Sequence, residues 1–481
     1  MRAGTLTSHA LTQAYLDRIA AIDDAGPALN AVIELNPDAL AAADALDAER
    51  RAGKLRGPLH GLPVLLKDNI DIAGMVNSAG SLALVDNRPA RDAFLVARLR
   101  AAGAVILGKT NLSEWANFRS THSSSGWSSR GGQTKNPYAL DRNPCGSSSG
   151  TGAAIAASLG ALGVGTETDG SIICPAAVNG LVGLKPTVGL LSRRGIIPIS
   201  ISQDTAGPMA RSVADAALLL NALAAIDPDD PAGHAATGRI PPDYIAFLKP
   251  DALAGKRFGL LRQAMGYHPQ VDAEMEHAVA TLQAGGATVV DVQVATYGKW
   301  DDAEYSVLLY EFKDGLNAYL KAAASTHASL RALIDWNFAH AATVMPFFAQ
   351  EIFEQADKKG PLTEVAYLKA RATARRLAGK DGLLAALDAD RLDALIAPSV
   401  APAWLTDHVL GDHFTGAGYG MAAVAGTPSL TVPMGEDHGL PLGITFMSRA
   451  YTEGELLGFG YAFEQATRAR KAPTYPATLP R

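Results

Sequence analysis

Helical and strand-like hydrophobic patterns alternate along the first third of the chain. Amphipathic helical patterns span residues 5–23, 36–53 and 92–103. Short apolar runs, typical of buried strands, span residues 62–68 and 104–110. The first helix is expected to begin at a capping residue, Thr7 or Ser8. This alternation favours an α/β fold in which helices and strands form separate layers.

The middle of the chain departs from this alternation. Residues 120–152 are rich in Ser, Gly and Asn, and a loop of this length in a compact enzyme is usually functional or disordered. A small-residue helix is expected from residue 153, followed by a buried strand at 161–167. The polar, Pro-rich residues 226–242 are the best candidate for a boundary or a long connection.

Strand-like and helical patterns return in the second half. We expect strands at 256–262, 288–294, 392–400, 428–435 and 441–448. We expect helices at 271–284 and 453–470, and a helix-rich block at about 303–390. The loop between the last two strands is typical of a hairpin, and no internal repeat or low-complexity tract interrupts the pattern.

Composition places the chain among globular proteins with a large core. Of its 481 residues, 48% are hydrophobic and 19% are charged. The formal net charge of −6, without a Lys/Arg cluster, argues against a dedicated nucleic-acid binder. No apolar run approaches the roughly 18 residues of a transmembrane helix, so no membrane partner is expected.

The two cysteines, Cys145 and Cys174, form neither a metal-ligand spacing nor a disulfide framework. This favours a reducing compartment, and we expect a cytoplasmic protein. The first 30 residues lack the apolar segment and cleavage site of a secretory signal. The sequence begins abruptly, however, so an upstream export signal remains an alternative.

Three serines between glycines, in "GSSSG" at 146–150, raise the first question of chemistry. Read as G-x-S-x-G, they offer Ser148 as the elbow nucleophile of an α/β-hydrolase. That motif needs a strand before it, but the preceding "TKNPYALDRNP" contains two prolines and is typical of a turn. The run "GVGTETDG" lacks the third glycine of a dinucleotide fingerprint, and the histidines show no metal-ligand spacing.

Lys67 ends an apolar strand-like run. An ordinary strand-end lysine explains the position in most proteins. The alternative is a lysine held in an apolar site, where desolvation lowers the pKa and a neutral amine can accept a proton.

Ser171 is expected where a strand becomes a short helix that starts near Cys174 or Pro175. Backbone N–H groups at such a junction are free to face an anion. A candidate oxyanion hole therefore consists of the N–H groups of Thr168, Asp169, Gly170 and Ser171. The alternative is that Ser171 only caps the helix, and its position alone does not decide.

Together these segments resemble the amidase signature family. The stretch "GSSSGTGAAIAASLGALGVGTETDGSI", the lysine in "LLKDN" and the ending "AGTPSLTVPMGEDHGLPLGITFMS" carry the resemblance, which thins between about 226 and 390. It implies a large mixed β-sheet covered on both faces by α-helices. It also implies one amidase domain over residues 1–481, with a variable, helix-rich substrate-entrance region at about 303–390.

The resemblance also implies a catalytic triad without a metal or cofactor. Ser171 falls on the family nucleophile, Ser147 on a bridging serine preceded by a cis peptide bond from Gly146, and Lys67 on the catalytic lysine. Ser147 would take the proton of Ser171 and pass its own to a neutral lysine. Ser148 then becomes a neighbour that helps to hold the network.

The motifs look most like those of bacterial peptide amidases, which hydrolyse C-terminal peptide carboxamides. Many other members carry "TGGSIR", where Asp169 and Ile173 replace Gly and Arg here, which argues against a glutaminase subunit of an amidotransferase. Aryl-acylamide, carbamate or small aliphatic amide substrates remain alternatives, as does a non-catalytic binding member. We expect the pocket to use 113–127 and 300–350, with aromatics that could equally be core, in a monomer or homodimer.

Overall fold

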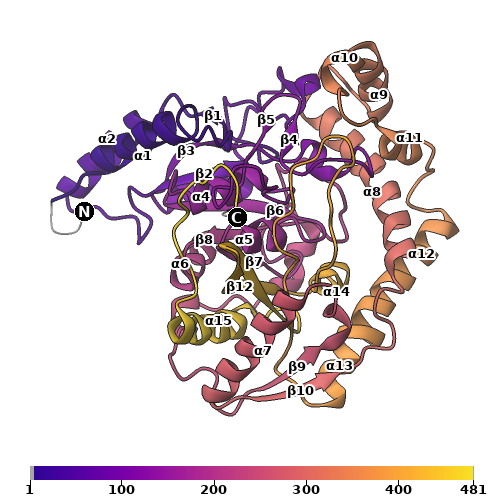
Figure 1. Ribbon diagram of the computed structural model, residues 1–481. Helices are drawn as coiled ribbons and strands as arrows, with labels where there is room; N and C mark the ends of the chain where they lie inside the picture. Colours follow the sequence, from indigo (N-terminus) through magenta and orange to yellow (C-terminus); the bar gives the residue numbers. More distant parts are fainter. Residues whose placement is uncertain (1–4, 480–481) are drawn as a thin grey trace.

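A large mixed sheet forms the centre of the fold in a computed structural model that describes residues 5–479 (Figure 1). Within these residues, eleven strands join in one sheet. In spatial order they are β1 (Val32–Leu35), β3 (Val105–Thr110), β2 (Pro63–Lys67), β6 (Leu162–Glu167), β8 (Thr205–Ala210), β7 (Val182–Lys185), β12 (Ser429–Asp437), β13 (Leu440–Met447), β11 (Ala394–Pro398), β9 (Arg257–Leu261) and β10 (Thr288–Val292). A separate ribbon pairs β4 (Trp127–Ser128) with β5 (Gly132–Gln133).

Helices cover both faces of the sheet. Successive strand side chains point to opposite faces, so each face forms its own hydrophobic cluster with the helices that cover it. In β2, Val64 and Leu66 belong to one cluster and Leu65 to the other. The first cluster includes side chains of α3 (Phe94–Ala101), α6 (Val213–Leu223), α7 (Pro269–Ala284) and α15 (Glu453–Thr467). The second includes side chains of α1 (Ser8–Ile22), α2 (Ala39–Arg51), α4 (Ser149–Ala156) and α5 (Ile173–Val178). The expected α/β architecture is therefore confirmed.

The helix-rich block is confirmed as a run of helices along one side of the molecule, drawn in orange tones in Figure 1. It comprises α8 (Asp301–Ala322), α9 (Leu330–Ala339), α10 (Ala341–Val344), α11 (Glu351–Asp357), α12 (Val365–Arg375) and α13 (Leu384–Ala389). A π-helical stretch, Arg376–Leu383, joins the last two. The short α14 (Gly420–Ala425) follows β11 and packs against this stretch.

Most elements expected from periodicity occur close to their expected bounds. Thr7 caps α1, and its side chain accepts a hydrogen bond from the backbone N–H of Ala10. Strands β7 and β8 and helix α6 were not anticipated. In β8, "TAGPMA" carries Gly207 and Pro208, residues that usually weaken a strand signal, yet it pairs with β6 over five residues.

The sheet brings two strand ends together beside one loop. β2 runs parallel to β6, with Val64 opposite Leu162 and Leu66 opposite Val164. Their carboxyl ends therefore lie at the same edge of the sheet, which places Lys67 next to Thr166. This edge carries the candidate site.

The two cysteines correct one expectation. Cys145 and Cys174 form a disulfide, with their Cα atoms 6.0 Å apart. The turn before Ser147 and the start of α5 lie side by side, although 29 residues separate the cysteines in sequence. The prediction of unpaired cysteines was wrong, and the argument for a reducing compartment loses its premise. Within residues 5–479, no helix is both long and apolar enough to cross a membrane.

Candidate active site

Lys67 is fully buried at the end of β2 and is held by three hydrogen bonds. Its Nζ lies 2.7 Å from Ser147 Oγ, 3.0 Å from Thr166 Oγ1 and 3.1 Å from the Thr166 carbonyl oxygen. Burial lowers the pKa of Lys67 to about 7, although the charges of Glu167 and Asp204 partly oppose this shift. Lys67 is therefore the desolvated lysine of the sequence hypothesis, not an ordinary strand-end lysine.

Ser147 follows a cis peptide bond from Gly146, the arrangement that the family resemblance implies. Gly146 is closely packed: a Cβ atom at this position would lie 2.1 Å from Ser113 Oγ. The turn therefore requires glycine at that point. It presents the Ser147 hydroxyl to Lys67 across the end of the sheet.

Ser148 is used structurally. Its Oγ donates to the Thr166 carbonyl oxygen at 3.0 Å and accepts from the Thr166 N–H at 3.2 Å. Its backbone N–H donates to the carbonyl oxygen of Ser171 at 3.1 Å. The residue thus ties the serine loop to β6 and to the turn before α5. No strand leads directly into it, since β5 ends at Gln133, so the elbow interpretation is wrong.

Ser171 lies in the turn between β6 and α5, as expected, and is 8% exposed. The amides at the start of α5 do not bind its hydroxyl. Instead, the N–H groups of Ile172 and Ile173 donate to Glu167 Oε2 at 2.7 and 3.0 Å. Within residues 5–479 the Ser171 hydroxyl makes no hydrogen bond. The helix-cap alternative is therefore wrong, and the hydroxyl is free to react.

The turn that carries the candidate oxyanion hole is tightly constrained. Gly170 has a φ of 78°, and a Cβ atom there would lie 2.2 Å from the Tyr419 ring. Both conditions demand glycine. Glu167 binds the first amides of α5, and the Gly170 N–H also interacts with this carboxyl.

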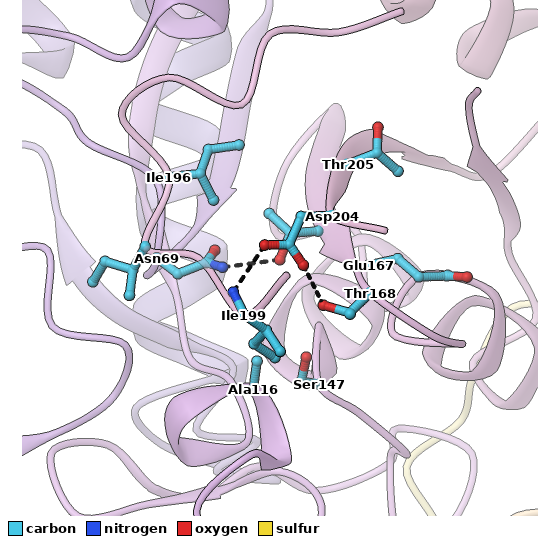
Figure 2. A pocket seen from close by; sticks show the side chains of 11 residues that line it. Asn69, Ala116, Ser147, Glu167, Thr168, Ile196, Ile199, Asp204 and Thr205 are labelled. Carbon is cyan, nitrogen blue, oxygen red and sulfur yellow. Dashed lines mark hydrogen bonds between the residues drawn. The ribbon is translucent and has the colours of Figure 1, made fainter. Parts of the chain in front are cut away.

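A small cavity lies beside the Lys67–Ser147 pair (Figure 2). Its lining residues are Asn69, Ala116, Ser147, Thr166, Glu167, Thr168, Ile196, Ile197, Ile199, Asp204 and Thr205. The Thr168 hydroxyl donates to Asp204 Oδ1 at 2.6 Å, and the Ile199 N–H donates to Asp204 Oδ2 at 2.8 Å. Figure 2 shows the Glu167 side chain directed away from Ser147. The cavity combines apolar walls with a few positioned polar groups, as small-molecule sites do.

Comparison with known proteins identifies the family. The family described as Amidase matches residues 10–457. A peptide amidase solved with the competitive inhibitor chymostatin is 57% identical, with a TM-score of 0.97, and the match covers 99% of this chain and 97% of that one. The native peptide amidase of Stenotrophomonas maltophilia is 56% identical, with a TM-score of 0.96 and coverages of 99% and 96%. A probable amidase of Arabidopsis thaliana is 41% identical over 98% of this chain and 89% of its own length.

The chain belongs to the amidase family. The resemblance drawn from its motifs is thereby confirmed, as is the amidase-signature fold with its large mixed sheet. The protein is a hydrolase that acts on carbon–nitrogen bonds. This removes the alternative of a non-catalytic binding protein.

A wider depression on this amidase lies next to the inner cavity. It includes Asn117, whose neighbour Ala116 lines the inner cavity. Its walls are Asn117, Phe118, Ser120, Thr121, His122, Ser123, Tyr305, Ile352, Leu410, Gly411, Asp412 and Phe414. The expected segments 113–127 and 300–350 thus both contribute, but 410–414 was not anticipated.

The aromatic residues of the expected pocket segments, 113–127 and 300–350, divide between the core and this depression. Trp115 packs edge-on against Phe353 in a buried cluster. Phe118 lines the depression and contacts Tyr305. Phe347 is 44% exposed and stacks on His408. Composition alone could not separate these positions.

Proposed function

We propose that this amidase hydrolyses the C-terminal carboxamide of short peptides, which yields the free acid and ammonia. The 57% identity to a peptide amidase over nearly the whole chain supports this substrate class. The observation that carries the chemistry is the buried lysine: Lys67 Nζ is bonded to Ser147 Oγ, while the Ser171 hydroxyl nearby in the site is free.

Lys67 is the base of the proposed reaction. With a pKa of about 7, a large share of Lys67 is neutral at neutral pH, so it can accept a proton. Ser147 accepts the proton of Ser171 and passes its own to Lys67 Nζ. The short contact between Ser147 and Lys67 is already formed, and the contact between Ser171 and Ser147 forms when substrate is bound.

Ser171 Oγ then attacks the carboxamide carbon. The N–H groups of Thr168, Asp169, Gly170 and Ser171 form the oxyanion hole, and removal of one such donor typically costs about 3–4 kcal/mol of transition-state stabilisation. The protonated lysine returns its proton through Ser147 to the leaving nitrogen, which departs as ammonia. Water attacks the acyl-enzyme by the same relay, which releases the acid and regenerates Ser171.

We infer that the whole chain, 1–481, is one amidase domain and that the block at about 303–390 borders the substrate entrance. Tyr305 and Ile352 from this block line the outer depression, which supports the second inference. The substrate that fits the proposal is a small molecule or a short peptide amide.

A substrate panel tests the proposal. C-terminally amidated dipeptides are compared with anilides and carbamates, and ammonia or amine release is measured. We expect turnover of the peptide amides, and a phosphonofluoridate label on Ser171 that Ser171→Ala abolishes. Turnover of anilides or carbamates without turnover of peptide amides would contradict the substrate assignment. A label on Ser148 would contradict the mechanism.

A further inference from the structure

Two carboxyl groups meet beside the nucleophile, outside the triad. Asp169 comes from the turn before Ser171, and Glu304 comes from the first turn of α8. Gln203 joins them to the same turn, because its Nε2 donates to Glu304 Oε1 at 2.8 Å and to the Thr168 carbonyl oxygen at 3.3 Å. The pair thus lies against the backbone that forms the proposed oxyanion hole.

The start of α14 closes this acidic pair on another side. Tyr419 lies directly over Gly170, and a Cβ atom on Gly420 would be 3.5 Å from Asp169 Oδ2. Glu304 is adjacent in sequence to Tyr305, which lines the outer depression. The pair therefore connects the turn that carries Ser171 with the first turn of α8, whose Tyr305 lines the outer depression.

Asp169 lacks the compensation that buried acids normally have. Its Oδ1 atom is buried and accepts no hydrogen bond from any residue in 5–479. Burial raises the pKa of Asp169, and the nearby charges of Glu304, Glu167 and Asp301 raise it further. No cation in the described chain forms an ion pair with it. The charges of Glu167 and Glu453 raise the pKa of Lys185 more than the charge of Asp169 does.

A buried acceptor without a donor is expensive, and such groups are rare unless a ligand completes them. The position suggests which ligand atom does so. One residue separates Asp169 from Ser171, and in an amino acid amide the nitrogen on the acyl Cα is two bonds from the carbon that Ser171 attacks. This nitrogen is an N–H donor in peptide amides, except those that end in prolinamide, and a cation in a protonated amino acid amide.

We propose that Asp169 accepts a hydrogen bond from the nitrogen on the acyl Cα of the substrate, with Glu304 as its positioning partner. This inference rests on the proposed function and deepens it. It makes the amidase selective for α-amino acyl amides over amides of the same shape without that nitrogen. A substrate without this N–H would leave a buried oxygen unpaired, so selectivity of about tenfold or more is expected.

Two matched substrate pairs test the inference in the wild-type protein. Phenylalaninamide is compared with 3-phenylpropanamide, which lacks the amine. N-acetylphenylalaninamide is compared with its N-methyl derivative, which lacks the N–H. We expect kcat/KM to be at least about tenfold higher for the first member of each pair. Equal values within each pair would overturn the inference and leave the proposed function intact. If none of the four amides is hydrolysed, the proposed function fails, and this inference fails with it.

Two variants test whether Asp169 and Glu304 are responsible for the selectivity. Asp169→Asn replaces one carboxyl oxygen by an amide donor with little change in shape, and it should reduce the phenylalaninamide preference to within about threefold. Glu304→Gln should weaken the same preference less, through a higher KM for the amine-bearing substrate. Asp302→Asn is the matched control, because Asp302 is exposed on the same helix and should retain full selectivity. Loss of activity by the same factor on both members of a pair would show a structural effect and overturn the assignment.

Discussion

Acidification should protonate Lys67, which then cannot act as the proposed base. At a pKa of about 7, Lys67 is roughly 90% neutral at pH 8 and roughly 1% neutral at pH 5. If only the neutral amine accepts the Ser147 proton, kcat/KM should fall about tenfold per pH unit below 7, and nearly a hundredfold between these two values. An ordinary lysine would place the midpoint of this acid limb near its usual value of 10.5.

The assay is kcat/KM for an N-acetylated peptide amide between about pH 5 and pH 9, because this substrate has no group that titrates there. Glu304 and Asp204 are the competing explanations, since burial raises the pKa of Glu304 to about 7 and that of Asp204 to about 6. The acid limb should persist in Glu304→Gln if Lys67 is the titrating base. Titration of Lys67 and titration of Asp204 are distinguished by the direction in which the acid limb moves. The charge of Asp204 raises the pKa of Lys67, so Asp204→Asn should move the acid limb to lower pH. Disappearance of the limb in Asp204→Asn, or a limb near pH 10 in the wild type, would refute the assignment of Lys67 as the titrating base.

Three further predictions concern Lys67, Ser148 and the disulfide before Ser147. Lys67→Ala should abolish amide hydrolysis yet retain some activity on activated esters, whose leaving groups need less protonation; undiminished amide turnover would contradict the relay. Ser148→Ala should still be labelled at Ser171 by a phosphonofluoridate, but it should melt at lower temperature because both bonds to Thr166 are lost, typically about 1 kcal/mol each. Reduction of the Cys145–Cys174 disulfide, measured by calorimetry with and without a thiol, should lower stability by about 3–4 kcal/mol; an unchanged Tm in fully reduced protein would contradict this.

The sequence predicted those parts of the site that depend on local pattern. Lys67 ends an apolar run, and Ser171 lies between a buried strand and a short helix, so periodicity placed both residues in the fold. Their proposed roles came from the family resemblance. The fold class followed similarly from alternating helical and strand-like segments. The residues that surround Lys67 and Ser171 in space were not predictable in this way. Asp204 reaches Thr168 from a loop more than 30 residues away, and only the pairing of β6 with β8 brings them together.

Other predictions failed where tertiary contacts overrode a local sequence rule. Ser171 has the residue type of a helix cap, yet Glu167, several residues earlier, binds the first amides of α5. Two cysteines are too few for a disulfide pattern in sequence, although the fold places them in bonding distance. Strand β8 contains Pro208, which sequence rules confine to edges and bulges, yet it lies between β6 and β7.

Three buried carboxyl groups surround the turn before Ser171, and their surroundings indicate different functions. Burial raises the pKa of Glu167, but Lys185 and the α5 amides oppose the shift, so this acid is suited to hold the turn. Asp204 accepts hydrogen bonds from the Thr168 hydroxyl and from two backbone amides, which suits it to shape the cavity wall. Asp169 has an unpaired buried oxygen and acidic neighbours, so neither explanation applies to it. A buried carboxyl oxygen that the fold leaves without a donor at this point is best explained by a donor that the substrate brings.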